Sequence, residues 1–145
     1  MKVRVKKLNE RAVLPTYGST GSAGGDLYCA EESDVTIGAG ETAFVGTGLA
    51  VEIPQGYVGL VYARSGLACK KGLAPANKVG VIDSDYRGEI KVALLNHGKE
   101  PQTITKGERI AQLVVAPYIF AEYEEADDLS DTVRGEGGFG STGRK

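Results

Sequence analysis

The sequence predicts an all-β domain that ends in a flexible, glycine-rich arm. Short runs in which apolar and polar residues alternate recur along most of the chain. Glycine accounts for 21 of the 145 residues, about twice the usual share, and most glycines lie between these runs. Few segments have helical periodicity over more than a turn or two. Many short strands with this spacing are typical of a β-sandwich, a jelly roll or a β-barrel.

Each expected strand is a short alternating run that is bounded by turn-forming residues. The expected strands are residues 2–6, 26–29, 35–37, 42–45, 49–53, 57–63, 79–82, 89–96, 103–104 and 108–117. Turn sequences occur at 38–41, 54–56, 96–99 and 105–108. The only helical element that we expect is a single turn near residues 64–69.

The C-terminal segment differs from the rest of the chain. Its last residues, RGEGGFGSTGRK, carry five glycines and one aromatic residue, Phe139. So many glycines should prevent a fixed conformation in isolation. We therefore expect a β domain over residues 1–133, followed by a lid over residues 134–145 that closes on a ligand. The alternative is an idle tail.

Charge and cysteine content narrow the class of protein. The net charge of -2 argues against a protein that coats nucleic acid, because such proteins are usually strongly basic. No apolar stretch approaches the roughly 18 residues of a membrane span. Cys29 and Cys69 stand alone, which predicts free thiols in a reducing compartment. We expect a cytoplasmic protein that contacts neither membrane nor nucleic acid.

The most informative segment is GVIDSDYRG, residues 80–88. An apolar run ends in Asp83 and Tyr86, and an alternating run resumes after it, which predicts a β-hairpin with these side chains at its tip. A turn between two strands is a rigid place for a general base or a cation partner. The alternative is an inert, solvated turn. In either case we expect Asp85 and Arg87 to form an ion pair.

Three further clusters carry groups that suit a phosphorylated ligand. Residues 63–67, ARSGL, place an arginine and a serine at the start of the helical turn, where anions bind. Residues 22–27, SAGGDL, place Asp26 at the start of a strand, where a carboxylate can serve either a turn or a hard cation. In the arm, glycine-rich backbone with Ser141 and Thr142 suits a polyphosphate, and Phe139 can stack on a base.

In this order, the clusters closely resemble the motifs of the trimeric dUTP diphosphatase (dUTPase) family. The five matching segments are SAGGDLY (22–28), ARSGLA (63–68), GVIDSDYRG (80–88), GERIAQL (107–113) and RGEGGFGSTG (134–143). Gly25 stands where the first motif often has Tyr, and Ala63 stands where the second often has Pro. Neither departure removes a reactive group.

The resemblance implies a distorted jelly-roll β-barrel that assembles as a homotrimer with shared active sites. It also implies hydrolysis of dUTP to dUMP and diphosphate by attack of water on the α-phosphorus, with Mg²⁺. This activity lowers dUTP, which limits uracil in DNA, and supplies dUMP for dTTP synthesis. A related dCTP deaminase and a binding module without catalysis are the alternatives.

The resemblance also assigns roles to individual residues. Asp83 would hold the 3′-hydroxyl and orient the water, and Tyr86 would exclude a 2′-hydroxyl. The residues implied around the uracil are Asn77, Gly80, Val81, Ile82 and Lys91, with Phe139 as its cover. Those implied at the phosphates are Arg64, Ser65, Gly66, Gln112, Arg134, Gly140, Ser141 and Thr142. Asp26 would reach Mg²⁺ through water.

The residue types agree with this chemistry. His97 is the only histidine and follows an expected strand, so a Ser-His-Asp mechanism is poorly supported. The sequence has no cluster of His and Cys that would suggest a zinc site. This lack favours a hard cation with oxygen ligands. Because an ordinary Asp with a pKa near 3.9 is a weak base, catalysis must depend on positioning the water and stabilising the phosphate charge.

Overall fold

Eleven strands and one short helix make up the part of the chain that the structure, a computed structural model, describes: residues 1–139. The strands are β1 (Arg4–Lys7), β2 (Gly25–Tyr28), β3 (Val35–Ile37), β4 (Thr42–Gly46), β5 (Leu49–Glu52), β6 (Tyr57–Tyr62), β7 (Leu73–Pro75), β8 (Gly80–Ile82), β9 (Lys91–Asn96), β10 (Gln102–Ile104) and β11 (Arg109–Pro117). The helix is α1 (Ser65–Lys71). The predicted all-β class is confirmed.

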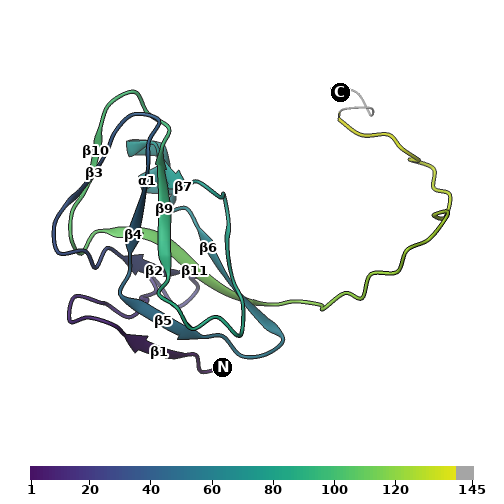
Figure 1. Ribbon diagram of the computed structural model, residues 1–145, viewed down its shortest axis with the longest axis horizontal. Coiled ribbons are helices and arrows are strands. Elements are labelled where there is room, and N and C mark those ends of the chain that lie inside the picture. Colours follow the sequence, from purple (N-terminus) through teal and green to yellow (C-terminus); the bar gives the residue numbers. More distant parts are fainter. Residues whose placement is uncertain (140–145) are drawn as a thin grey trace.

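The strands form four small antiparallel sheets. The largest has the order β2-β11-β6-β8, and the next has the order β4-β9-β7. β1 pairs with β5, and β3 pairs with β10. β11 is the longest strand and pairs with both β2 and β6, so it crosses the body in Figure 1. Short strands distributed over several facing sheets are consistent with a distorted jelly roll.

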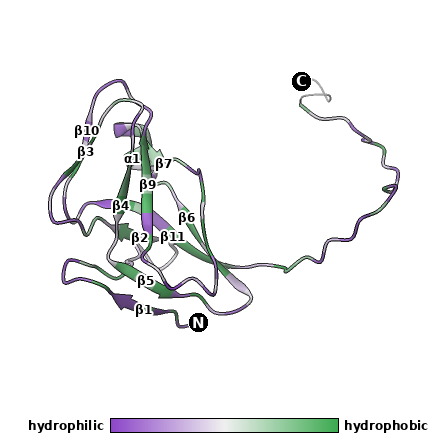
Figure 2. Ribbon diagram, viewed as in Figure 1, coloured by the Kyte–Doolittle hydropathy of each residue, from purple (hydrophilic) through white to green (hydrophobic). Residues whose placement is uncertain are grey.

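Apolar side chains from facing sheets fill the interior. In β9, buried Val92, Leu94 and Asn96 alternate with less buried residues, as expected for a strand with one face on the core. β5 is coloured hydrophobic and β1 hydrophilic in Figure 2. Most residues of β1 are exposed, and among the described strands β1 pairs only with β5, so β1 is an outer strand. The largest fully buried side chains are Leu27, Ile37, Leu49, Ile53, Leu73, Ile90, Leu94, Ile104, Ile110, Val45, Val51 and Val92.

Both cysteines are free, as predicted. Cys29 is buried in the core, and Cys69 is exposed on α1. Burial raises the pKa of the Cys29 thiol, because the interior disfavours the thiolate. Among residues 1–139, no helix is long and apolar enough to cross a membrane.

The helix is longer than the predicted single turn, because its stop signal lies further along the chain. Gly72 adopts a left-handed conformation with φ +66°, and its N–H donates to the carbonyl oxygens of Leu67 and Ala68. Strand β7 follows at once and was not predicted. It has only three residues and ends in Pro75, so it lacks the length and composition by which strands are recognised.

The prediction of a hairpin at residues 80–88 is wrong. β8 pairs with β6, whereas β9 pairs with β4 and β7. The segment between β8 and β9 therefore connects two different sheets. Alternation shows that two runs are strands, but the partner of each strand is chosen by core packing.

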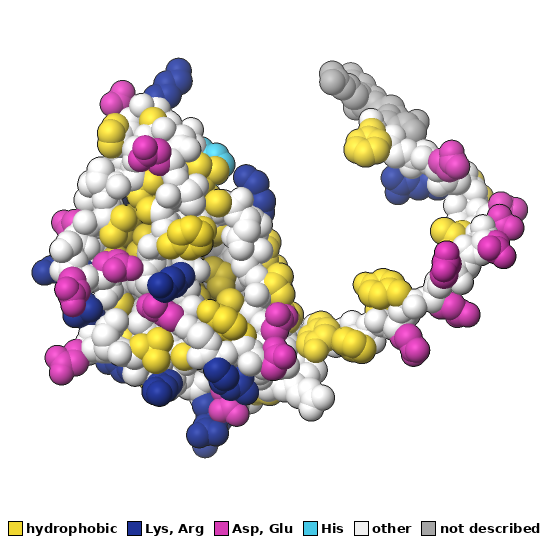
Figure 3. Space-filling model, in the orientation of Figure 1, with side chains coloured by type: hydrophobic (Ala, Val, Ile, Leu, Met, Phe, Trp, Pro, Cys, Tyr) yellow, Lys and Arg dark blue, Asp and Glu magenta, His cyan; other side chains and the backbone are white. Residues whose placement is uncertain are grey.

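Beyond β11 the chain leaves the body as an extended arm. Residues 118–136 are exposed, and Figure 1 shows the arm curving away from the sheets. Acidic side chains recur along it in Figure 3. The last strand thus ends at Pro117, before the boundary at residue 133, which stays a prediction together with the lid.

An ion pair fastens the helix to the turn before β11. Lys71 Nζ lies 2.8 Å from Glu108 Oε1 and also donates to the Thr103 carbonyl oxygen at 3.2 Å. Burial alone would raise the pKa of Glu108. The hydrogen bonds from Lys71 and Thr105 outweigh burial, so the pKa of Glu108 is lower than its ordinary value.

This pair predicts a pH-dependent contribution to stability. A lowered glutamate pKa stabilises the fold above the unfolded-state pKa of about 4.3, and the contribution is lost as the pH falls through the folded-state pKa. We expect Lys71→Met to lower the free energy of unfolding by about 1 kcal/mol at pH 7. The deficit should shrink between pH 5 and pH 3 in urea titrations at one protein concentration. A deficit that stays constant over this range would contradict the assignment.

Candidate active site

The connection between β8 and β9 carries two of the predicted site residues. Asp83 follows β8, and its carbonyl oxygen accepts a hydrogen bond from the Tyr86 N–H at 3.2 Å. The Tyr86 hydroxyl donates to the Glu89 carbonyl oxygen at 3.0 Å. A Cβ at Gly88 would overlap the Tyr86 phenol, so glycine is required there for the phenol to fold back. Asp83, Tyr86 and Lys91 line one cavity of about 630 Å³.

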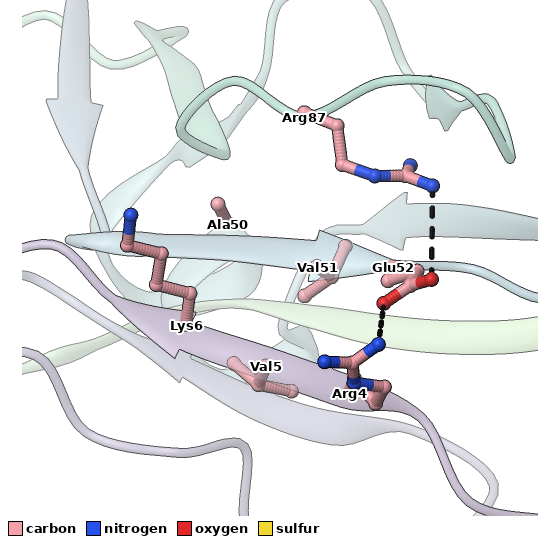
Figure 4. A pocket seen from close by; sticks show the side chains of 7 residues that line it. All are labelled: Arg4, Val5, Lys6, Ala50, Val51, Glu52 and Arg87. Atoms are coloured by element: carbon pink, nitrogen blue, oxygen red, sulfur yellow. Dashed lines mark ion pairs between the residues drawn. The ribbon is translucent and has the colours of Figure 1, made fainter.

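The predicted ion pair between Asp85 and Arg87 is wrong. Arg87 instead lies 3.9 Å from Glu52 on β5, and Glu52 also pairs with Arg4 at 3.1 Å (Figure 4). Arg87 further donates to the carbonyl oxygens of Ser84 and Tyr86 at 2.7 and 2.9 Å. Arg87 therefore fixes the connection in two ways: it bonds to backbone carbonyl groups within the connection, and it pairs with β5, a strand that is distant in sequence.

β8 offers free backbone groups beside this cavity. It is an edge strand, because β6 pairs with only one of its sides, so the hydrogen-bonding groups on its other side are not used by the sheet. Asn77 lies close to it, with Nδ2 3.6 Å from the position of a Cβ on Gly80. Gly80, Val81 and Ile82 therefore form a backbone edge that Asn77 borders.

A second group of predicted residues surrounds Asp26. Its side chain is 10% exposed and pairs through Oδ1 with Arg64 Nε at 2.8 Å, and through Oδ2 with Arg109 at 3.1 Å. Gln112 of β11 lies directly opposite Asp26 of β2 and Tyr62 of β6, so the sheet register brings it to the same face. One carboxylate and two guanidinium groups leave an excess of positive charge, which suits an anionic ligand.

Arg109 was missed by the sequence-based reasoning. It lies inside the segment GERIAQL, in which only Gln112 was predicted to be a site residue. No sequence pattern links it to Asp26, because only the fold shows that this carboxylate is buried and therefore requires cationic or hydrogen-bonding partners. The exposed residues Ser65 and Gly66 follow Arg64 directly at the start of α1.

The residues around Asp26 fit Mg²⁺ only through water. Within residues 1–139, no group of three or more His, Cys, Asp or Glu side chains could hold a metal ion by itself. Asp26 is a single carboxylate, and each of its oxygens already accepts one hydrogen bond, which leaves one further acceptor position on each. Mg²⁺ keeps several waters and is bound by one or two carboxylates together with substrate phosphates, and this donor set meets that requirement.

The two groups lie at opposite ends of β6. Ile82 pairs with Gly59, so Asp83 follows β8 beside Val58, near the start of β6. Arg64 follows the end of β6, six residues beyond Val58, and an antiparallel strand rises about 3.4 Å per residue. The backbones of Asp83 and Arg64 in one chain are therefore about 20 Å apart.

The start of the arm lies near the first group, because Tyr118 and Phe120 line a further cavity together with Asp83. From residue 121 to residue 139, the hydrogen bonds of the arm all stay within the arm. Arg134 donates from Nε to the Gly137 carbonyl oxygen at 2.7 Å, and Phe139 is exposed. The predictions for Gly140, Ser141 and Thr142 fall outside the described residues. The predicted roles of the arm stay predictions.

Comparison with known proteins gives a consistent result. The family model described as dUTPase matches residues 10–143. A deoxyuridine 5′-triphosphate nucleotidohydrolase of Nautilia profundicola is 54% identical over 144 residues, which is 99% of this chain and 100% of that protein. The protein of the same name from Rickettsia felis is 50% identical over 142 residues, covering 97% of this chain and 96% of the relative.

The similar solved structures are also dUTPases. The dUTPase of Staphylococcus bacteriophage 80alpha with dUpNHpp has a TM-score of 0.86 and 33% identity, and the match covers 98% of each chain. A mutant dUTPase from phage phi11 of S. aureus, described with a structural Mg(II) ion, has a TM-score of 0.82 and 27% identity over 90% of this chain and 100% of that chain. The chain described here belongs to the dUTPase family.

Proposed function

We propose that this protein hydrolyses dUTP to dUMP and diphosphate, which lowers dUTP and supplies dUMP for dTTP synthesis. Membership of the dUTPase family supports the reaction. The single observation that carries the proposal is the cavity shared by Asp83, Tyr86 and Lys91 beside the free edge of β8. It offers an exposed carboxylate, a fixed phenol and unused backbone groups to a nucleoside.

Asp83 is proposed to position the attacking water. Aspartate carboxylates in general, with a reference pKa of about 3.9, are too weakly basic to remove a proton from water completely. A carboxylate can accept hydrogen bonds from the water and from the 3′-hydroxyl, and hold both in the geometry of attack on the α-phosphorus. The rate gain then comes from orientation.

Selection of the sugar and of the base would use different parts of the cavity. The Tyr86 phenol is held by the Glu89 carbonyl oxygen and folds over Gly88, so a 2′-hydroxyl placed against it would meet a ring that cannot move aside. The edge of β8 can donate a backbone N–H to the uracil O4. Cytosine presents an amino donor there, and such a buried mismatch can reject an analogue by about 10⁴–10⁵.

The group around Asp26 is proposed to bind the triphosphate. Arg64 would contact phosphate oxygens together with Ser65, Gly66 and Gln112. Bound Mg²⁺ would supply charge neutralisation of the phosphates, and Asp26 would hold it through water. The remaining proposed contacts come from Arg134, Gly140, Ser141 and Thr142 at the γ-phosphate and from Phe139 over the uracil.

The active site is proposed to combine several chains of a homotrimer. The 3′-hydroxyl and the α-phosphorus of a nucleotide are separated by a few covalent bonds, whereas Asp83 and Arg64 of one chain are about 20 Å apart by strand rise. Asp83 of one copy and Arg64 of another would therefore serve the same substrate. Exposed Phe44, Val81 and Tyr86 around the cavity support its coverage by a neighbour.

The arm suits contact with another copy as well. Its acidic residues are Glu122, Glu124, Glu125, Asp127, Asp128, Asp131 and Glu136, and Tyr118, Ile119 and Phe120 are exposed at its start. The outer strand β1 carries the opposite charge at Arg4, Lys6 and Lys7. The third copy would then supply the glycine-rich lid.

The role of Asp83 predicts the behaviour of a conservative variant. We expect Asp83→Asn to reduce kcat for diphosphate release from dUTP by at least about 100-fold, because an amide cannot orient the water as a carboxylate does. Asp85→Asn is the matched control, since Asp85 is an exposed carboxylate in the same connection, and it should keep kcat within about threefold. Full activity of Asp83→Asn would contradict the mechanism.

The role of the arm predicts the effect of truncation. Removal of residues 134–145 should reduce dUTP turnover by about 100-fold or more, because the contacts to the γ-phosphate and the cover over the uracil are lost. The truncated protein should keep its thermal stability and its size in solution. Unfolding or dissociation after truncation would show that the segment is structural, and undiminished turnover would show that it is idle.

A further inference from the structure

Glu89 belongs to the nucleoside cavity, and none of the proposed roles uses its side chain. It lines the cavity with Asp83, Tyr86 and Lys91, and its side chain is 26% exposed. Oε1 accepts a hydrogen bond from the Gly48 N–H at 2.8 Å, which ties the side chain to the turn between β4 and β5. The carboxylate is therefore anchored on the body of the protein.

The same residue touches two of the groups that are assigned to the nucleoside. Glu89 Oε2 lies 3.7 Å from Lys91 Nζ, and the Glu89 carbonyl oxygen accepts the Tyr86 hydroxyl at 3.0 Å. The intervening Ile90 is fixed, because its carbonyl oxygen accepts the hydroxyl of buried Thr47 at 2.7 Å. Glu89 thus connects Tyr86 and Lys91 to one rigid turn.

The turn has room for this carboxylate because residue 46 is a glycine. A Cβ at Gly46 would lie 2.6 Å from Glu89 Oε1 and 3.0 Å from Glu31 Oε1. Gly46 also pairs directly with Lys91 across β4 and β9. An alanine at this position would displace the Glu89 carboxylate without removing its charge, and would disturb its hydrogen bond with the Gly48 N–H.

We propose that Glu89 is a positioning residue that orients Lys91, and through its backbone Tyr86, toward the nucleoside, and so sets the affinity for the nucleoside part of the substrate. This inference rests on the proposed function. The Lys91 ammonium can swing on a flexible stem, and a fixed carboxylate beside it limits where it points. Glu89 acts through Lys91 and Tyr86 and touches no reacting atom.

Such a role affects binding more than chemistry. Contacts to the base and sugar are present in both the ground state and the transition state, so their loss raises KM and leaves kcat nearly unchanged. Because the Lys91 side chain is 55% exposed, solvent screens its pair with Glu89, and we expect a several-fold effect at most.

The test compares two independent ways of disturbing Glu89. Glu89→Gln keeps an oxygen acceptor for the Gly48 N–H and loses the charge beside Lys91, whereas Gly46→Ala keeps the charge and moves it. Each full-length variant should raise KM for dUTP, and the dissociation constant of dUMP, about three- to fivefold. In both variants kcat should stay within about twofold.

Matched controls separate positioning from general damage. Glu31 also contacts Gly46, because its Oε1 accepts the Gly46 N–H at 2.6 Å, but it does not line the cavity. Glu31→Gln therefore removes a nearby carboxylate that has no part in the proposal. Gly38→Ala is the counterpart of Gly46→Ala, since a Cβ at Gly38 would lie 2.6 Å from Glu41 Oε2. Both controls should keep KM. An equal rise of KM in the controls would overturn the proposal, as would unchanged KM in the two test variants.

A double-mutant cycle tests whether Glu89 acts through Lys91. In a Lys91→Met background, Glu89→Gln should raise KM by clearly less than it does in the unaltered protein. Fully additive effects would overturn the proposed route. Assays of the unaltered protein separate the two proposals. Absence of dUTP turnover would remove the proposed function, whereas normal turnover with insensitive Glu89 variants would remove only the role of Glu89.

Discussion

The register of β8 against β6 is the constraint on which the rest of the structure depends. By pairing Ile82 with Gly59, it places Asp83 near the start of β6, while Arg64 follows the end of the same strand. About six residues of strand, or about 20 Å, then separate Asp83, which is proposed to position the water, from Arg64, which is proposed to bind phosphate. A single chain therefore presents two incomplete halves, and the proposed assembly and arm follow from that separation.

Each half is preorganised by the sheet that holds it. At one end, the register of β2, β11 and β6 gathers Asp26, Gln112 and Arg64, and Arg109 completes the charge balance around the buried carboxylate. At the other end, the connection from β8 to β9 is fixed by Arg87 and Glu52 and by the Tyr86 hydroxyl. These internal contacts hold the shape of each half, which reduces the ordering cost of binding.

The sequence predicted elements better than contacts between them. Alternation located nearly all the strands, because the period of two is a local property, but it missed β7, which is too short and ends in Pro75. The hairpin was wrong because β8 and β9 join different sheets. Arg87 was assigned to Asp85, its neighbour in sequence, whereas its partner Glu52 is brought close only by the fold. Local patterns did not identify Arg109 or Glu89, and the division of the named residues of the β domain between the two ends of β6 depends on register, which no local pattern contains.

The most direct test of the account is complementation between two inactive variants. Asp83→Asn and Arg64→Gln proteins would be unfolded together in urea in equal amounts, refolded, and assayed for diphosphate release from dUTP. If Asp83 of one chain and Arg64 of another serve one site, random assembly of a symmetric oligomer leaves about a quarter of the sites with both native residues. The refolded mixture should therefore recover about that fraction of the unaltered activity. A mixture that stays at the level of its two inactive parents would contradict a site shared between chains.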